Sequence, residues 1–261
     1  MFASFMAGTW IAGSAVAVVA GVVGYFVVLR GETFAAHALP QGAFAGAAGA
    51  AVLGLSPVLG AGAFSLLGAG VIALLGRRGR HDVAAALALV LLLASGALFL
   101  GLSTSYAPEV FSLLFGQLLG VGLGDTPAIV AVSLACVLLA GALFRPLLAW
   151  SALGDASVVR GRRSAAVEAA FLVLLTLATT AAVPVVGAFL MFSLVSAPAA
   201  AVRLLARSPL VGVAGSVAVA LGIVWASVAL GYLTSWPIGF FVGAGGALSY
   251  GVARLVARVR S

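Results

Sequence analysis

Long apolar runs alternate with short polar or arginine-bearing breaks along nearly the whole chain. A helix that crosses the hydrocarbon core of a bilayer needs about 20 predominantly apolar residues, and runs close to that length recur here. The pattern predicts an all-α fold, a polytopic transmembrane helical bundle of about eight or nine spans, in one domain over residues 1–261. The runs cover about residues 5–29, 33–55, 60–75, 83–102, 127–144, 165–183, 186–205, 210–233 and 238–255.

Two stretches depart from this regular alternation. Residues 106–124 mix Pro108 and Glu109 with apolar positions, which indicates an amphipathic segment lying in or dipping into the membrane interface. Further on, Pro184 is expected to end the sixth run. The sixth and seventh runs are therefore either separate spans or an irregular hairpin that protein covers, which leaves the count between eight and nine.

Composition excludes a soluble globular protein. Mean hydropathy is +1.29 and only 7% of residues are charged, so too little polar surface exists to cover a soluble core. The net charge of +7 comes from thirteen arginines and no lysine, spread between the apolar runs, which indicates membrane orientation and not nucleic-acid binding. With nine spans all the arginines fall on one side, predicted to be cytoplasmic together with the C-terminus.

Polar side chains gather where the first two apolar runs meet. Ionisable groups at a membrane span are costly and therefore indicate function. His37, one of two histidines, lies four residues before Gln41, so on a helix the two share a face, with Pro40 bending the helix between them. The alternative is a histidine hydrogen-bonded to a backbone carbonyl, with Gln41 as a polar neighbour. We interpret Glu32, beside Arg30, as a solvated charge.

Five stretches, in order, resemble the membrane permease subunits of ABC importers for zinc, manganese and related divalent metals. The first holds Val-Leu-Arg, a Phe and the start of the second run, where the family has Asp-Ala-Leu-Ser-His. The second, FSLLFGQLL, is similar to the family's Leu-Phe-Gly-Asp-Ile-Leu. The resemblance covers residues 27–46, 111–119, 144–154, 185–207 and 230–246, and so spans nearly the whole chain.

This resemblance implies a multi-pass permease of the bacterial plasma membrane that moves zinc, manganese or iron by alternating access. Its implied partners are a second permease copy in a homodimer or heterodimer, two cytoplasmic ATPase subunits that bind the ATP, and an extracytoplasmic metal-binding protein. No permanently bound cofactor is implied. The chain has no GxxxxGK[ST] phosphate loop, so we expect a non-catalytic subunit whose ATPase partner hydrolyses ATP.

The resemblance also implies site residues. Aligning the Phe and the following Ala-Leu places His37 at the family's Asp position and Gln41 at its His position. Imidazole is a good ligand for these metals and a neutral amide is a weak one, so the pair predicts a transient, low-affinity site. The polar loop 146–164 resembles the family's cytoplasmic loop and predicts an ATPase-coupling helix, formed by Ala152, Leu153, Gly154 and Asp155.

Two other functions stay open at this point. The same fold can import a metal chelate, haem or another small solute, because the Asp-His pair is not retained as such. A membrane scaffold that has lost transport is the second alternative. Secondary transport by ion coupling is disfavoured, because the sequence has no paired intramembrane carboxylates.

Overall fold

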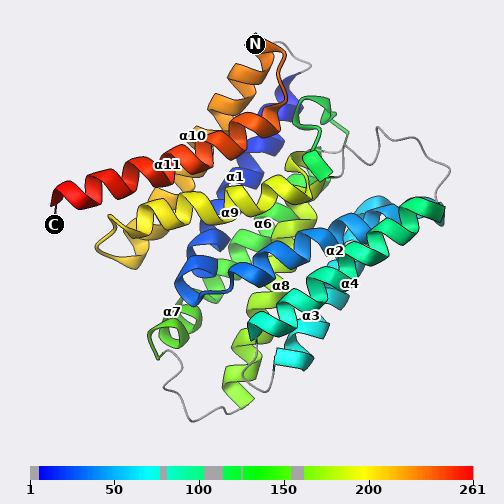
Figure 1. The fold of residues 1–261 in the computed structure, drawn as a ribbon, viewed down its shortest axis with the longest axis horizontal. Helices are drawn as coiled ribbons and strands as arrows, with labels where there is room; N and C mark the ends of the chain where they lie inside the picture. The colour runs from blue at the N-terminus through cyan, green and yellow to red at the C-terminus, as the bar shows by residue number, and fades with distance from the viewer. Residues whose placement is uncertain (1–5, 77–80, 103–113, 125, 154–161, 261) are drawn as a thin grey trace.

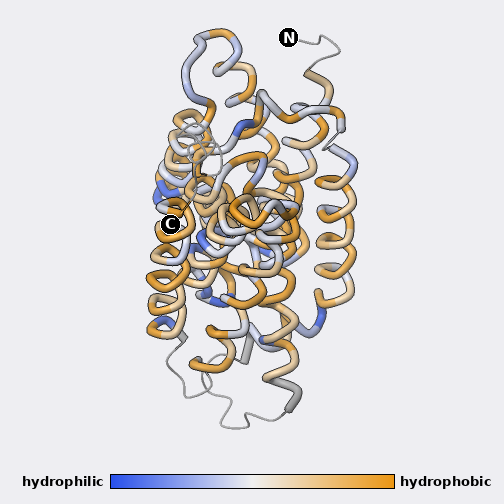
Figure 2. The backbone as a smooth tube through the Cα atoms, turned by 90° about the vertical axis from the view of Figure 1, so that its right-hand side faces the viewer, coloured by the Kyte–Doolittle hydropathy of each residue, from blue (hydrophilic) through white to orange (hydrophobic). Residues whose placement is uncertain are grey.

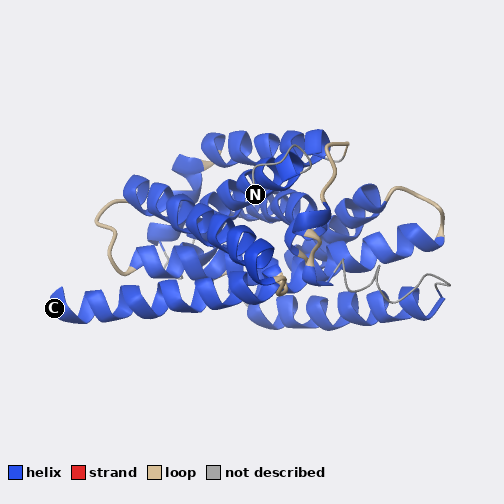
Figure 3. Ribbon diagram, turned by 90° about the horizontal axis from the view of Figure 1, so that it is seen from above, coloured by secondary structure: helices blue, strands red, loops and turns tan. Residues whose placement is uncertain are grey.

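The computed structural model describes residues 6–76, 81–102, 114–124, 126–153 and 162–260. Within this part the chain is helical and contains no strand (Figure 3), which confirms the predicted all-helical bundle. The helices are α1 (Ala7–Arg30), α2 (Thr33–Val52), α3 (Pro57–Gly76), α4 (His81–Leu102), the 3-10 helix η2 (Leu118–Gly120), α6 (Thr126–Ala142), α7 (Phe144–Leu153), α8 (Arg162–Val186), α9 (Ala188–Arg203), α10 (Pro209–Thr234) and α11 (Ile238–Arg260).

Six of the described helices are long and apolar enough to cross a membrane, namely α1, α3, α4, α8, α10 and α11. Helices α6 and α7 meet at a bend of 58° and make a seventh span if they are counted together. By length and composition, the described helices thus provide six or seven spans, slightly fewer than the eight or nine predicted. The difference lies in α9, which has only 16 residues, and in α2, which carries polar and proline positions.

Burial separates central helices from peripheral ones. Within an apolar 18-residue stretch of each helix, 67% and 72% of the residues are buried in α1 and α8, against 17–33% in α3, α4, α10 and α11. The exposed surface of the peripheral helices is rich in Leu and Val, and Figure 2 shows apolar residues along most of the backbone. Apolar side chains directed outward suit a lipid environment, so the fold is that of a multi-pass membrane protein.

Small residues bring the central helices close to their neighbours. A Cβ atom built on Gly24 of α1 meets the carbonyl oxygen of Val195 in α9 at 2.0 Å. In the same way, a Cβ on Gly46 of α2 meets the carbonyl oxygen of Gly60 in α3 at 2.0 Å. These contacts show that small residues of α1 and α2 let other helices pack closely on them, as is usual between helices in membranes.

The break between α8 and α9 falls at Gly187 and not at Pro184. Helix α8 continues through Pro184 to Val186, so the prediction that the proline ends the span is wrong. A proline this near the helix end removes only one hydrogen bond, whereas Gly187 takes φ 85°, which a side chain disfavours. A Cβ there lies 2.3 Å from the nitrogen of Gly116, so the backbone near Gly116 packs directly on this junction.

The predicted amphipathic segment is described only from residue 114 onward, and residues 106–113 lie outside the described part. From there the chain forms a helical turn, two non-helical residues and then η2. Its apolar positions Leu118 and Val121 are buried, and η2 packs on α1 and α8. The segment therefore caps the central helices at one end of the bundle.

The ends of the helices divide into two groups in Figure 1. The α1–α2 turn, α7, the α9–α10 turn and the C-terminus lie toward the lower left, whereas the α10–α11 turn and the α2–α3 turn lie toward the opposite end. The arginines of the described residues belong to segments of the first group and to the start of α8, which lies at the bottom of the view. This arrangement agrees with the one-sided distribution of arginine predicted from the sequence.

Candidate functional site

Helix α2 carries two polar side chains that face the interior of the bundle. Gln41 is 1% exposed, and neither its amide nitrogen nor its amide oxygen has a hydrogen-bond partner in the described part of the chain. His37, one turn earlier, is half-buried, and its Nδ1 is likewise buried without a partner there. The structure thus places the two predicted residues on one helix, one turn apart, with Nδ1 of His37 and both amide atoms of Gln41 unpaired among the described residues.

The environment of His37 is aromatic. Its ring lies 4.9 Å from the ring of Phe192 in α9, centroid to centroid, in an edge-to-face arrangement. Among the described residues no backbone carbonyl accepts a hydrogen bond from Nδ1. A purely structural histidine is expected to make that bond, so the geometry at Nδ1 gives this alternative no support.

The backbone of the same turn is also unusual. Pro40 has no N–H group to donate to the carbonyl of Ala36, yet α2 remains helical across it. Next to it, the hydroxyl of Ser65 in α3 donates a buried hydrogen bond of 3.0 Å to the carbonyl of Leu39. This turn of α2 therefore places the backbone carbonyls of Ala36 and Leu39 near the side chains of His37 and Gln41.

The described part of one chain does not form a closed set of metal ligands at this place. No three His, Cys, Asp or Glu side chains of the described residues come close enough together to hold an ion. Glu32 precedes α2 and interacts electrostatically with Arg30. Cys136, the single cysteine, is buried in α6, and its Sγ lies 3.6 Å from the carbonyl oxygen of Leu174.

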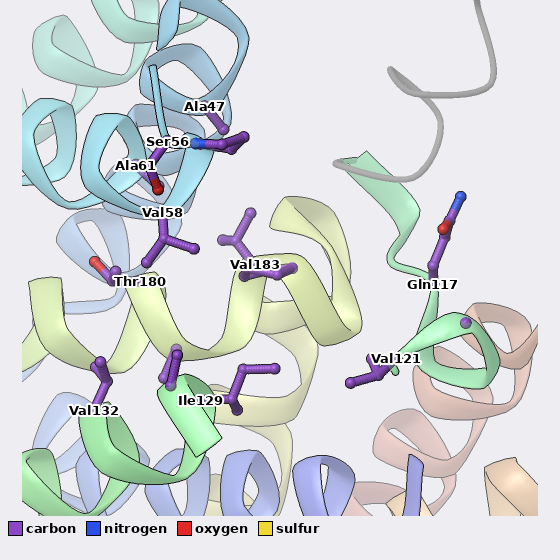
Figure 4. Close-up of a pocket in the computed structure, with 15 residues that line it drawn as sticks. Ala47, Ser56, Val58, Ala61, Gln117, Val121, Ile129, Val132, Thr180 and Val183 are labelled. Carbon is purple, nitrogen blue, oxygen red and sulfur yellow. The ribbon is translucent and has the colours of Figure 1, made fainter. Parts of the chain in front are cut away.

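A cavity of about 370 Å³ lies between the α2–α3 turn, α6 and α8 (Figure 4). Ala47, which lines it, follows Gln41 by six residues, a rise of about 9 Å along the helix. Its lining is mainly apolar, with Ser56, Gln117 and Thr180 as polar exceptions and no carboxylate, imidazole or thiol. The lining therefore offers no strong metal ligand, and the predicted ligands are still His37 and Gln41 on α2.

Comparison with known proteins identifies the family. Residues 3–257 match the ABC 3 transport family. The chain belongs to the ABC 3 transport family. This confirms the resemblance to permease subunits of metal ABC importers that the sequence stretches indicated.

Relatives of this ABC 3 family chain share most of its length. It is 30% identical to the manganese import system permease protein ScaB of Streptococcus parasanguinis over 206 residues, 78% of this chain and 73% of the relative. It is 24% identical to the manganese transport system membrane protein MntC of Listeria monocytogenes over 204 residues, 77% and 72% of the two chains. Among solved structures, PsaBC from Streptococcus pneumoniae in complex with Fab matches with a TM-score of 0.84 and 27% identity, covering 97% of this chain and 91% of that one.

The predicted coupling residues of the ABC 3 chain are described only in part. Ala152 and Leu153 are the last two residues of α7, whereas Gly154 and Asp155 lie outside the described residues. Their role stays a prediction. Phe192, in contrast, was missed by sequence reasoning, because an aromatic residue inside an apolar run gives no signal of its own. Only the packing of α9 on α2 reveals its contact with His37.

Proposed function

We propose that this ABC 3 family chain is the permease subunit of an importer for a divalent metal, with manganese as the first candidate. A separate ATPase drives alternating access. One relative is named a manganese import system permease protein and another a manganese transport system membrane protein. The observation that carries the proposal is the His37–Gln41 pair. Two single buried hydroxyls, of Thr9 and Ser133, also lack a partner among the described residues, but only His37 and Gln41 lie together one turn apart on a helix. The buried hydroxyls of α8 and α10 bond to carbonyls of their own helix, as at Thr176, Thr179, Thr180, Ser216 and Ser227.

Unpaired donors inside the bundle suit a passing cation. The imidazole nitrogen of His37 and the amide oxygen of Gln41 replace part of the hydration shell of the metal. Both are neutral, so the site holds a divalent ion weakly and releases it quickly. Conduction requires binding that is favourable enough for entry and weak enough for exit. A second permease copy supplies another His37 and Gln41, which brings the number of neutral donors to four.

The remaining partners follow from the architecture of ABC importers. We propose that two ATPase subunits bind at the cytoplasmic side, where residues 152–155 dock, and that an extracytoplasmic metal-binding protein delivers the ion at the opposite end. The C-terminus then lies on the ATPase side. The position of α7 at the arginine-bearing end of the bundle supports this assignment.

Transport by reconstituted complexes tests the proposal. Proteoliposomes hold the permease with its ATPase and binding protein, and the uptake of manganese, zinc and iron is measured with and without ATP. We expect ATP-dependent uptake in which manganese exceeds the other two metals. If zinc or iron is taken up faster than manganese, that metal replaces manganese as the proposed cargo. ATP hydrolysis that the binding protein stimulates without uptake of free metal contradicts the proposal and favours a chelate, haem or another solute. The absence of both activities favours a scaffold.

A further inference from the structure

The last turn of α1 collects contacts from three other helices. Arg203, the last residue of α9, donates a hydrogen bond from Nη1 to the carbonyl oxygen of Val28. Phe144, the first residue of α7, packs edge-to-face on Phe26, with ring centroids 5.7 Å apart. Helix α8 provides the third contact, through Arg30. The end of α1 is therefore fixed to α7, α8 and α9 at one level of the bundle.

The contact with α8 is made by a partly buried charge. The Cζ of Arg30 lies 4.9 Å from the ring centroid of Phe171, a side chain that is only 1% exposed. Glu32 and Glu168 both attract the guanidinium, and its Nε is buried without a hydrogen-bond partner in the described part of the chain. A cation over an aromatic ring, with nearby carboxylates and little water, is held more strongly than an exposed ion pair.

These contacts connect two functional regions. Helix α7 ends at Leu153 and α8 begins at Arg162, so both helices that flank the predicted coupling segment touch the last turn of α1. Only Gly31 and Glu32 separate that turn from α2. Backbone hydrogen bonds from Glu32 to Val27 and from Ala36 to Glu32 hold the connection, and His37 is the next residue.

We propose that Arg30 is a positioning residue that transmits movement of α8 to α2. When the ATPase partner displaces the cytoplasmic end of α8, Phe171 and Glu168 carry the guanidinium with them. The short α1–α2 turn follows, and with it the turn of α2 that bears His37 and Gln41. Arginine is suited to this role because its planar guanidinium stacks on a ring and pairs with carboxylates at once, which lysine does less well. This inference rests on the function proposed above.

The test measures coupling and not activity alone. The reconstituted complex is prepared with Arg30→Gln, Arg30→Lys or Glu168→Gln, and the number of manganese ions taken up per ATP hydrolysed is determined. We expect Arg30→Gln to lower this ratio about tenfold, a loss of the size expected for a desolvated cation–π and ion-pair contact, while ATP hydrolysis continues. Arg30→Lys keeps the charge, so it should recover part of the ratio. Glu168→Gln should lower it less than Arg30→Gln.

Arg207→Gln serves as the matched control, because Arg207 is an exposed arginine beyond the end of α9 at the same side of the bundle. It should leave the ratio unchanged. Thermal unfolding in detergent shows which variants fold. If Arg30→Gln does not fold, Arg30→Lys and Glu168→Gln decide the matter. A wild-type ratio in every folded variant overturns the inference alone, whereas absent uptake by the wild-type complex overturns the proposed function.

Discussion

At the scale of single residues, Gln41 is the least expected side chain in the bundle. A buried amide without a hydrogen bond costs about 1–3 kcal/mol by comparison with protein mutational data. No group in the described part of the chain forms a hydrogen bond with this amide. An apolar side chain of similar length would fill the same space without this cost. Such a residue is explained if its amide oxygen must stay available to a ligand that passes through.

The substitution Gln41→Met tests this explanation. Methionine keeps the length of the side chain and removes the unpaired polar atoms, so the free energy of unfolding should rise by about 1 kcal/mol. ATP-dependent metal uptake should fall at the same time. Both are measured on the purified permease and on the reconstituted complex. Gln117→Met, at an exposed glutamine, is the control and should change neither. Loss of stability in Gln41→Met would show that the amide has a partner in the folded protein.

At the scale of helices, α2 depends on close backbone contact with α3. A Cβ built on Gly60 lies 2.3 Å from the carbonyl oxygen of Gly46. Two helix backbones leave no room for a side chain at that distance. This contact, together with the hydrogen bond from Ser65 to Leu39, fixes the rotation of α2 and so the direction in which His37 and Gln41 point.

Two glycine-to-alanine substitutions on α3 separate the effect of this close contact on stability from the effect of helix propensity. Gly60→Ala should destabilise the permease by about 1–3 kcal/mol, because overpacking forces the two backbones apart. Gly70→Ala meets nothing within 4 Å and should be neutral or stabilise by up to about 1 kcal/mol, since alanine favours a helix more than glycine does. Thermal unfolding in detergent measures both. Equal effects of the two substitutions would contradict the close packing of α2 on α3.

At the scale of the whole molecule, the arginine-bearing ends predict the orientation in the membrane. Cationic residues are retained on the cytoplasmic side, so the α1–α2 turn, α7, the α9–α10 turn and the C-terminus should face the ATPase. The α2–α3 turn should face the opposite compartment. The single cysteine, Cys136, is buried, so the unmodified chain gives little background in thiol labelling.

Cysteine labelling in cells tests this orientation. Ser56→Cys places a thiol on the exposed α2–α3 turn, and Ser261→Cys places one at the C-terminal residue of the chain. A membrane-impermeant maleimide should label the first variant in intact cells and the second only after permeabilisation. The unmodified chain is the control in both conditions. The opposite pattern would reverse the assigned sides of the membrane.

Much of this architecture is predictable because apolar length and helical spacing act locally. The helical class and the one-turn spacing of His37 and Gln41 were both expected. The break after the sixth run was expected at Pro184 and lies at Gly187, because the close approach that requires a glycine there comes from Gly116, far away in the sequence. For the same reason the contact between His37 and Phe192 was not expected, since α9 reaches α2 only in the folded chain.

The most direct measurement of the central claim compares the two histidines of the chain. Manganese uptake driven by ATP is recorded in proteoliposomes for the wild type, for His37→Ala and for His81→Ala, the second histidine, at the start of α4. If His37 lies on the metal pathway, His37→Ala loses most of the uptake while the complex still assembles and hydrolyses ATP, and His81→Ala transports like the wild type. Unchanged uptake by His37→Ala would contradict the account and leave the histidine with a structural role.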